Sequence, residues 1–145
     1  MTADAGSPRE AARQIGAAVA ALGIECFDAM GEGTGAAVAM WLALASEAQI
    51  GSVVLAAPAS VLGGQPDEAF REIEQPVLVL SGTKDASDAV GRWRTLLPDC
   101  HFMFVYDAGS AIGAERPEAL AFITLEFFKR RELFLVSREN GVVFP

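Results

Sequence analysis

The sequence is poor in the residues that build metal sites and disulfide frameworks. Its 145 residues include one histidine and two cysteines, Cys26 and Cys100, which lie far apart and form no CxxC pair. Zinc sites and disulfide scaffolds need several such residues at close spacing. We therefore expect no metal and no cofactor, and we expect both thiols to be reduced and buried.

Basic residues are also scarce. Eleven lysines and arginines stand against nineteen aspartates and glutamates, which gives a formal net charge of −8. Nucleic acids and anionic membranes are bound through a basic face, so neither is an expected partner. The one basic cluster, Lys129 to Arg131, falls at a predicted helix end, where cations complement the helix dipole.

Long apolar runs are missing as well. No stretch of about 20 residues could span a bilayer, and the longest apolar window, Ile15 to Ile24, is interrupted by Gly16 and Gly23. The first 13 residues contain no apolar segment of the kind found in secretory signals. The sequence thus predicts a cytoplasmic protein, and residues 1–145 are expected to form a single domain.

Short apolar runs alternate with longer segments of helical character. The expected strands are Ile24–Met30, Ser52–Ala57, Val77–Leu80 and Phe102–Tyr106. The expected helices run from Pro8 to Gly23, Thr34 to Ala48, Ala86 to Leu97 and Pro117 to Arg131, whereas Ala59–Glu74 is expected to be loop-like with some helix potential. This alternation predicts an α/β fold with a parallel sheet of about four strands and helices on both faces.

A glycine-rich turn joins the first strand to the helix that follows it. The residues Gly31-Glu32-Gly33-Thr34-Gly35 lead directly into an alanine-rich segment. Small residues at this spacing allow the tight reversal of a nucleophile elbow, in which a catalytic side chain is presented between strand and helix.

Two later motifs follow in the order that α/β-hydrolases use. Val77–Asp85 resembles the strand and loop that deliver the catalytic acid, and Tyr106–Ser110 resembles the strand end that delivers the histidine. With the elbow, they make nearly the whole chain from Pro8 onward resemble the C-terminal half of an α/β-hydrolase. The resemblance implies a three-layer fold, shortened by the family's first strands and by the loop that supplies part of the oxyanion hole.

Transferred to this sequence, the family's catalytic triad is incomplete. The nucleophile position falls on Gly33, the acid position on Asp85 and the histidine position on Ser110. Glycine offers no nucleophile and serine is no base near neutral pH. The single histidine, His101, begins the fourth strand, and a rise of about 3.3 Å per residue places it at the opposite end from the elbow. We therefore predict a non-catalytic protein with a binding or scaffolding role.

Glycine suits the elbow position, because a residue with a Cβ is strained there by about 1–3 kcal/mol. The backbone amides of the turn still open a helix, so Glu32, Gly33, Thr34 and Gly35 are the candidate ligand-binding residues, with a small carboxylate or phosphate as the ligand.

Two other functions fit parts of the same sequence. A weak ester hydrolase could use Thr34 or Cys26 as its nucleophile, but Thr34 is expected to cap the helix and Cys26 to be packed inside a strand. Gly31–Ala36 also matches the dinucleotide-binding fingerprint. That fingerprint expects an acidic residue at the end of the next strand, and Ser52–Ala57 ends without one, which makes nucleotide binding the less favoured alternative.

The absence of the family's first strands predicts an exposed sheet edge. The strand Ile24–Met30 would lack a neighbour on one side, and long apolar edges are normally covered. We expect a two-fold homodimer in which these strands pair into one continuous sheet. A separate partner chain could provide the cover instead, as could the segment 133–145, a possible arm or hairpin with a turn signal at Asn140-Gly141.

Overall fold

The computed structural model describes residues 6–45, 49–58, 67–85, 93, 95–97 and 100–131. The elements in chain order are α1 (Pro8–Ala21), β1 (Cys26–Glu32), α2 (Gly35–Ala45), β2 (Gln49–Ala56), η1 (Asp67–Glu72), β3 (Val77–Gly82), β4 (His101–Val105), α4 (Ile112–Glu115) and α5 (Pro117–Arg130). Strands and helices alternate through most of the described chain, which is the order of an α/β fold.

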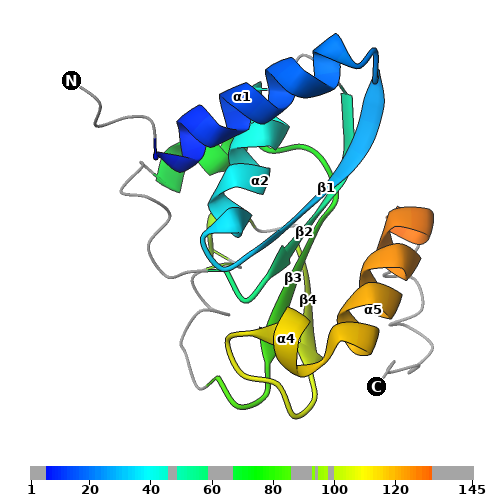
Figure 1. Ribbon diagram of the computed structural model, residues 1–145. Coiled ribbons are helices and arrows are strands. Elements are labelled where there is room, and N and C mark those ends of the chain that lie inside the picture. The colour runs from blue at the N-terminus through cyan, green and yellow to red at the C-terminus, as the bar shows by residue number, and fades with distance from the viewer. Residues whose placement is uncertain are drawn as a thin grey trace.

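The four strands form one parallel sheet in the order β1-β2-β3-β4. Figure 1 shows α1 and α2 on one side of this sheet and α5 on the other, and Ile112 of α4 packs in the core on the α5 side. The register aligns Glu32 with Ala56, and Gly82 with Val105, so the four strands end at the same edge. The predicted three-layer architecture of about four parallel strands is confirmed, and it collects the strand-to-helix loops at one edge of the sheet.

Helix α1 begins at the predicted residue and ends two residues before Gly23, which the sequence predicts as its stop. The Ser7 hydroxyl accepts a hydrogen bond of 3.1 Å from the backbone N–H of Glu10, and Pro8 occupies the first turn. The helix ends at Ala21, and Gly23 adopts a φ of +71°, which glycine reaches without a steric penalty. Local capping chemistry therefore fixes the helix that leads into β1.

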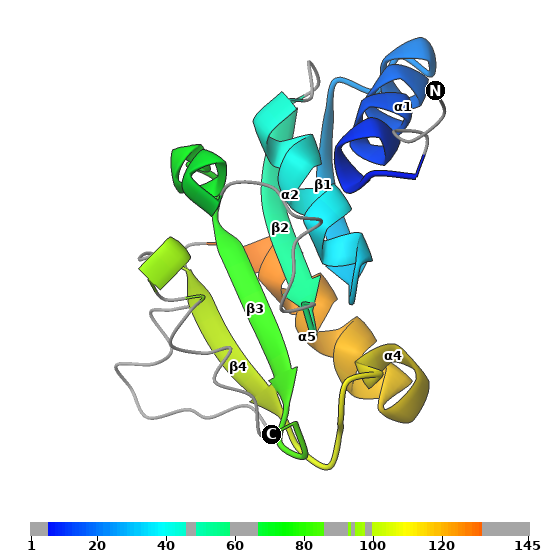
Figure 2. The ribbon, with the colours of Figure 1, turned by 90° about the vertical axis from the view of Figure 1, so that its left-hand side faces the viewer.

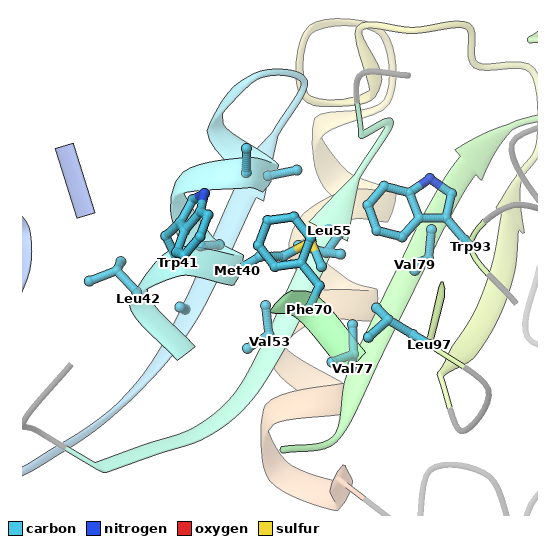
Figure 3. Close-up of a cluster of buried hydrophobic side chains, with 14 of the residues drawn as sticks. Met40, Trp41, Leu42, Val53, Leu55, Phe70, Val77, Val79, Trp93 and Leu97 are labelled. Atoms are coloured by element: carbon cyan, nitrogen blue, oxygen red, sulfur yellow. The ribbon is translucent and has the colours of Figure 1, made fainter. Parts of the chain in front are cut away.

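The first hydrophobic core fills the space between the sheet and the α2 side. Met40 and Trp41 of α2 meet Phe70 of η1, and the Trp41 and Phe70 rings pack edge to face with their centroids 5.2 Å apart. Figure 3 shows these side chains gathered over Val53 and Val77 of the sheet. Side chains that are 0% exposed, such as Met40 and Phe70, make this the anchor of α2.

The second core lies on the α5 side. Leu120, Ile123 and Phe127 of α5 pack with Val54 of β2 and Leu80 of β3. Because β2 and β3 are covered on both faces, their side chains are almost all apolar, as is typical of parallel strands inside a three-layer fold.

A polar cluster on the α5 side links the end of α5 to the first two strands. The hydroxyl of Ser52, which is 0% exposed, donates a 2.7 Å hydrogen bond to Oδ1 of Asp28, and Arg131 approaches the same oxygen at 3.6 Å. The pairing of β1 with β2 is irregular here, since two residues of β1 match three of β2. A Cβ at Gly51 would lie 2.5 Å from Nη2 of Arg131, so a glycine leaves room for the arginine.

Several expected boundaries shift in the structure. Strand β1 runs from Cys26 to Glu32 rather than from Ile24 to Met30, so it continues through the first residues of the glycine turn. The prediction that Cys26 is buried inside a strand is wrong, because Cys26 opens β1 and is exposed. Cys100 is half-buried.

Other expectations fall on residues that the structure does not describe. Most of the helix expected at 86–97 and the whole of 133–145 lie outside the described residues. Residues 59–66 of the expected loop are also undescribed, whereas its later part forms the short helix η1.

The buried serine gives a test of the polar cluster. Ser52→Ala removes the hydroxyl that solvates the half-buried Asp28 carboxylate, so the free energy of unfolding should fall by about 1–2 kcal/mol. Ser110→Ala is the matched control, because Ser110 is exposed and its loss should change stability by less than about 0.5 kcal/mol. Urea unfolding of both variants measures the difference; equal stabilities would contradict this account of the cluster.

Candidate functional site

The turn after β1 has the backbone geometry of a nucleophile elbow. Gly33 follows the last residue of β1 with a φ of +60°, and its N–H donates a 2.9 Å hydrogen bond to the carbonyl of Ala56. Helix α2 begins two residues later, at Gly35. The chain therefore reverses within a few residues at the carboxyl edge of the sheet.

The glycines of this turn have different roles. A Cβ at Gly31 would collide with the backbone carbonyl of Gly35, so the strand and the helix can approach only if residue 31 lacks a side chain. A Cβ at Gly33 would meet nothing within 4 Å. Position 33 thus has open space in front of it, as a nucleophile would need, but no side chain to place there.

Glu32 joins the elbow to a loop that is remote in sequence. Its Oε2 accepts a 2.7 Å hydrogen bond from the backbone N–H of Gly113, at the start of α4. This bond brings the segment that follows Ser110 beside the elbow. Sequence reasoning missed Gly113, and no motif around it gives a signal; the pairing becomes visible only when the sheet order is known.

The carboxylate of Glu32 also changes the candidate ligand site. Glu32 is only three residues before the start of α2, and a negative charge in the candidate segment opposes the binding of an anion there. Within Glu32–Gly35, Glu32 is occupied in holding the α4 loop, and Thr34 is exposed just before the helix begins.

Asp85 follows β3 in a loop that is bound to the loop after β4. The N–H of Asp85 donates to the carbonyl of Gly82, and the N–H of Lys84 donates to the carbonyl of Ala108 at 2.9 Å. Nζ of Lys84 lies 2.7 Å from Oδ1 of Asp107. The acid-bearing loop is therefore held against the loop that leads to Ser110.

A third contact fixes these two loops. The Thr83 hydroxyl accepts a 2.9 Å hydrogen bond from the N–H of Asp107, whose φ is +58°. A Cβ at Gly82 would collide with the carbonyl of Ala108, so the close approach of the loops depends on a glycine at the end of β3.

Ser110 is exposed on the loop that precedes α4. On its two sides the loop is tied down, by a 2.7 Å hydrogen bond from the Gly109 N–H to Glu115 and by a 2.8 Å bond from Arg116 to the carbonyl of Tyr106. The three positions Gly33, Asp85 and Ser110 thus follow β1, β3 and β4 at one edge of the sheet, and hydrogen bonds connect their loops. A nucleophile and a base are missing from these positions.

His101 lies at the other end of the sheet. It is the first residue of β4, pairs with Leu78 in the register and is 6% exposed. Its ring packs edge to face on Phe127 of α5, with centroids 5.7 Å apart. A histidine buried at the amino edge of the sheet cannot act as a base at the elbow.

The other candidate groups are also separated from the elbow or lack support. Cys26 opens β1, whereas the elbow follows the end of that strand. Strand β2 ends at Ala56 without an acidic residue that could hold a ribose. Among the described residues there is no group of three His, Cys, Asp or Glu that could hold a metal ion. No described helix is long and apolar enough to cross a bilayer.

Comparison with solved structures identifies the fold. The chain resembles a predicted CIB-like hydrolase from Thermoplasma acidophilum at 23% identity and a TM-score of 0.75, over 90% of this chain and 62% of that one. It resembles the naproxen esterase of Bacillus subtilis at 16% identity and a TM-score of 0.72, over 85% and 67%. It resembles MenH from S. aureus at 12% identity and a TM-score of 0.69, over 87% of this chain and 76% of that one.

These similarities show that the chain has the α/β-hydrolase fold. It spans 62% of the length of the first of these structures and 67% of the second. No protein-family model matches the sequence, and no curated protein matches it. The expected relationship to α/β-hydrolases is confirmed at the level of the fold.

Single alanine substitutions test what each of the three glycines of the elbow contributes to stability. Gly31→Ala should lower the free energy of unfolding by about 2–3 kcal/mol, because backbone atoms block the new Cβ. Gly33→Ala should cost roughly 1 kcal/mol from its positive φ alone. Gly35→Ala meets no neighbour and should leave stability unchanged or raise it by up to about 1 kcal/mol. Thermal unfolding checks the order; Gly35→Ala as damaging as Gly31→Ala would contradict this geometry.

The ion pair between Lys84 and Asp107 predicts how the pKa of Asp107 departs from its ordinary value. The hydrogen bond from Lys84, followed by its positive charge, lowers the pKa of Asp107 below its ordinary value of 3.8. Any stability that this pair contributes is present above about pH 4 and is lost as the pH falls through the lowered pKa of Asp107. Both side chains are more than half exposed, so salt should weaken the effect.

Lys84→Met tests this assignment. The pKa of Asp107, followed by carboxyl NMR shifts, should rise toward 3.8 in the variant, and 1 M salt should raise it in the wild type. If the pKa of Asp107 is the same in Lys84→Met as in the wild type, a group other than Lys84 lowers it.

Proposed function

We propose that the protein is a non-catalytic member of the α/β-hydrolase fold, with a binding or scaffolding role at its carboxyl-edge loops. The observation that carries this proposal is the residue at the elbow: Gly33 has the φ of a nucleophile position and open space before it, but no nucleophilic atom. Acyl transfer in this fold needs that atom and a base that accepts its proton.

The position expected for the base supports the same conclusion. Ser110 occupies it, and the single histidine of the chain is buried against Phe127 at the opposite edge. Asp85, without an imidazole to orient, has no role in this chemistry.

The hydrogen bonds between the loops support a scaffolding role. They tie the elbow to the α4 loop and the Asp85 loop to the Asp107 loop, all through backbone groups or short contacts. Such a surface is preorganised, which lowers the entropic cost of binding a partner or ligand. Glu32–Gly35 remains the candidate ligand-binding segment.

Ester hydrolysis is the alternative, since several structures with this fold are described as esterases. An assay of esterase activity distinguishes the two functions. We expect the purified protein to hydrolyse p-nitrophenyl acetate and butyrate no faster than a heat-denatured sample, and to remain unlabelled by a fluorophosphonate probe.

A gain-of-function variant sharpens this test. Gly33→Ser supplies the missing oxygen, and the open space admits it, but Ser110 still provides no base. The variant should therefore show no esterase activity above the wild type and no fluorophosphonate labelling, with an active esterase of the same fold as the positive control. Labelling of Gly33→Ser at its new serine, or of the wild type, would overturn the proposal.

A further inference from the structure

Trp41 of α2 carries a buried hydrogen-bond donor. Its side chain belongs to the first core and is 7% exposed, and its Nε1 has no acceptor among the described residues. Buried donors in folded proteins are almost always paired, because removal from water without a partner destabilises the fold. The N–H of Trp41 therefore needs an acceptor that the described part of the chain does not supply.

The contacts of the Trp41 ring leave this N–H at the rim of the core. The ring packs edge to face on Phe70, with centroids 5.2 Å apart. Figure 3 shows the ring nitrogen turned away from Leu42 and Val53. Because side chains of a helix lean toward its N-terminus, the N–H points toward the start of α2, at the carboxyl edge of the sheet.

The guanidinium of Arg9 lies over the same ring. Its Cζ is 5.1 Å from the ring centroid of Trp41, and Arg9 is an exposed residue. Among the described residues no carboxylate forms an ion pair with Arg9, whereas Arg13, on the next turn of α1, pairs with Glu10 at 2.6 Å. The positive charge of Arg9 is thus balanced only by the face of an aromatic ring.

The helical positions on α1 bring this positive charge, and no negative charge, to Trp41. Ala12 is 3% exposed and marks the side of α1 that packs in the first core. At 100° per residue, Arg9 lies about 60° from Ala12, whereas Glu10 lies about 160° away, on the opposite side of the helix. The Glu10 carboxylate also accepts hydrogen bonds from Arg13 and Gln14.

The start of α1 adds its helix dipole to the same place. Arg9 is the second residue of α1, at the positive end of the dipole. Figure 2 shows this first turn beside α2, and Figure 1 shows that α1 runs from the carboxyl-edge side of the sheet toward the start of β1. The buried N–H, the guanidinium and the positive end of α1 therefore lie together, without the negative charge that Glu32 places before α2.

We propose that Arg9 and Trp41 form a binding site for a small oxyanion, the carboxylate or phosphate group of a ligand, where α1 meets α2. The guanidinium offers a fork of N–H donors to two oxygens of the anion, and Nε1 of Trp41 donates to one of them. Both side chains are donors only, so a cationic ligand finds no acceptor in them. The site is separate from Glu32–Gly35 and does not depend on the function proposed for the elbow.

The exposed side chain of Arg9 also accounts for access to a buried N–H. In the free protein it lies over the Trp41 ring and shields it from water. A long arginine side chain at the surface changes rotamer readily, and an anion draws the guanidinium from the face of the ring toward its nitrogen edge. That movement uncovers the N–H and brings both donors to the anion.

The two tryptophans of the chain, Trp41 and Trp93, allow a direct test. Each indole N–H gives its own signal in a 1H–15N NMR spectrum, and Trp41→Phe identifies the signal of Trp41. Sodium acetate and sodium phosphate are titrated separately at constant ionic strength, with chloride as the balancing anion. We expect one or both to move the Trp41 indole proton downfield and to saturate, while the Trp93 signal stays in place as the internal control.

Two arginine variants form a matched pair for this titration. Arg9→Gln and Arg13→Gln each remove one positive charge from the first half of α1. Arg9→Gln should raise the apparent Kd of the anion at least about tenfold, because a charge-assisted contact is lost. Arg13→Gln should change the Kd by less than about twofold, since Arg13 is paired with Glu10 on another side of the helix.

Three results would overturn the proposal. If neither anion moves the Trp41 signal, its N–H is not a ligand donor. If both arginine variants weaken binding equally, the anion responds to net charge and not to a site. If the backbone amides of Thr34 and Gly35 shift while the Trp41 signal does not, the anion binds at the elbow, and the function proposed there stands without this site. Should Trp41→Phe fail to fold, Trp93→Phe identifies the Trp41 signal by elimination.

Discussion

A parallel sheet must be covered on both faces, and this constraint determines most of the structure. Val53 and Leu55 of β2 point to the α2 side, while Val54 and Ala56 point to the α5 side, and all four are 0% exposed. The chain can bury such strands only if helices lie on both faces of the sheet. Every strand then ends at one edge, where the loops that follow β1, β3 and β4 come together.

The loops at that edge are held by hydrogen bonds between backbone groups and by hydrogen bonds from backbone N–H groups to a few polar side chains. Glu32 accepts from Gly113, Thr83 accepts from Asp107, and Lys84 donates to Ala108. Two of the close approaches require glycine, at positions 31 and 82, because backbone atoms of the neighbouring segment occupy the place of a Cβ. These contacts hold the loops that carry Gly33, Asp85 and Ser110 in one arrangement at the carboxyl edge of the sheet.

The sequence was informative where a local signal coincides with a tertiary need. Ser7 and Gly23 bound α1 as capping chemistry predicts, and apolar runs mark the buried strands. It was less informative at the edge strand. The positions of Cys26 and of the end of β1 depend on how far β2 pairs with it, and local propensity does not encode that length.

The candidate site, like the fold, was predictable from the sequence only in part. Gly33 and His101 could be placed from the sequence, because a strand has a fixed rise and each position follows from the strand that carries it. The bond between Glu32 and Gly113 could not, since it joins residues 81 positions apart and depends on the sheet order. The same is true of Arg131, which reaches Asp28 past Gly51.

The elbow geometry of this chain has a cause in the backbone that does not depend on the side chain at position 33. The close crossing of β1 and α2 depends on Gly31, whose missing Cβ lets the strand pass the carbonyl of Gly35. The positive φ at position 33 follows from that reversal, whichever residue stands there. A glycine at position 33 then adopts the conformation at the lowest cost. Elbow geometry alone is therefore evidence of the fold, and the side chain at position 33 is the evidence about chemistry.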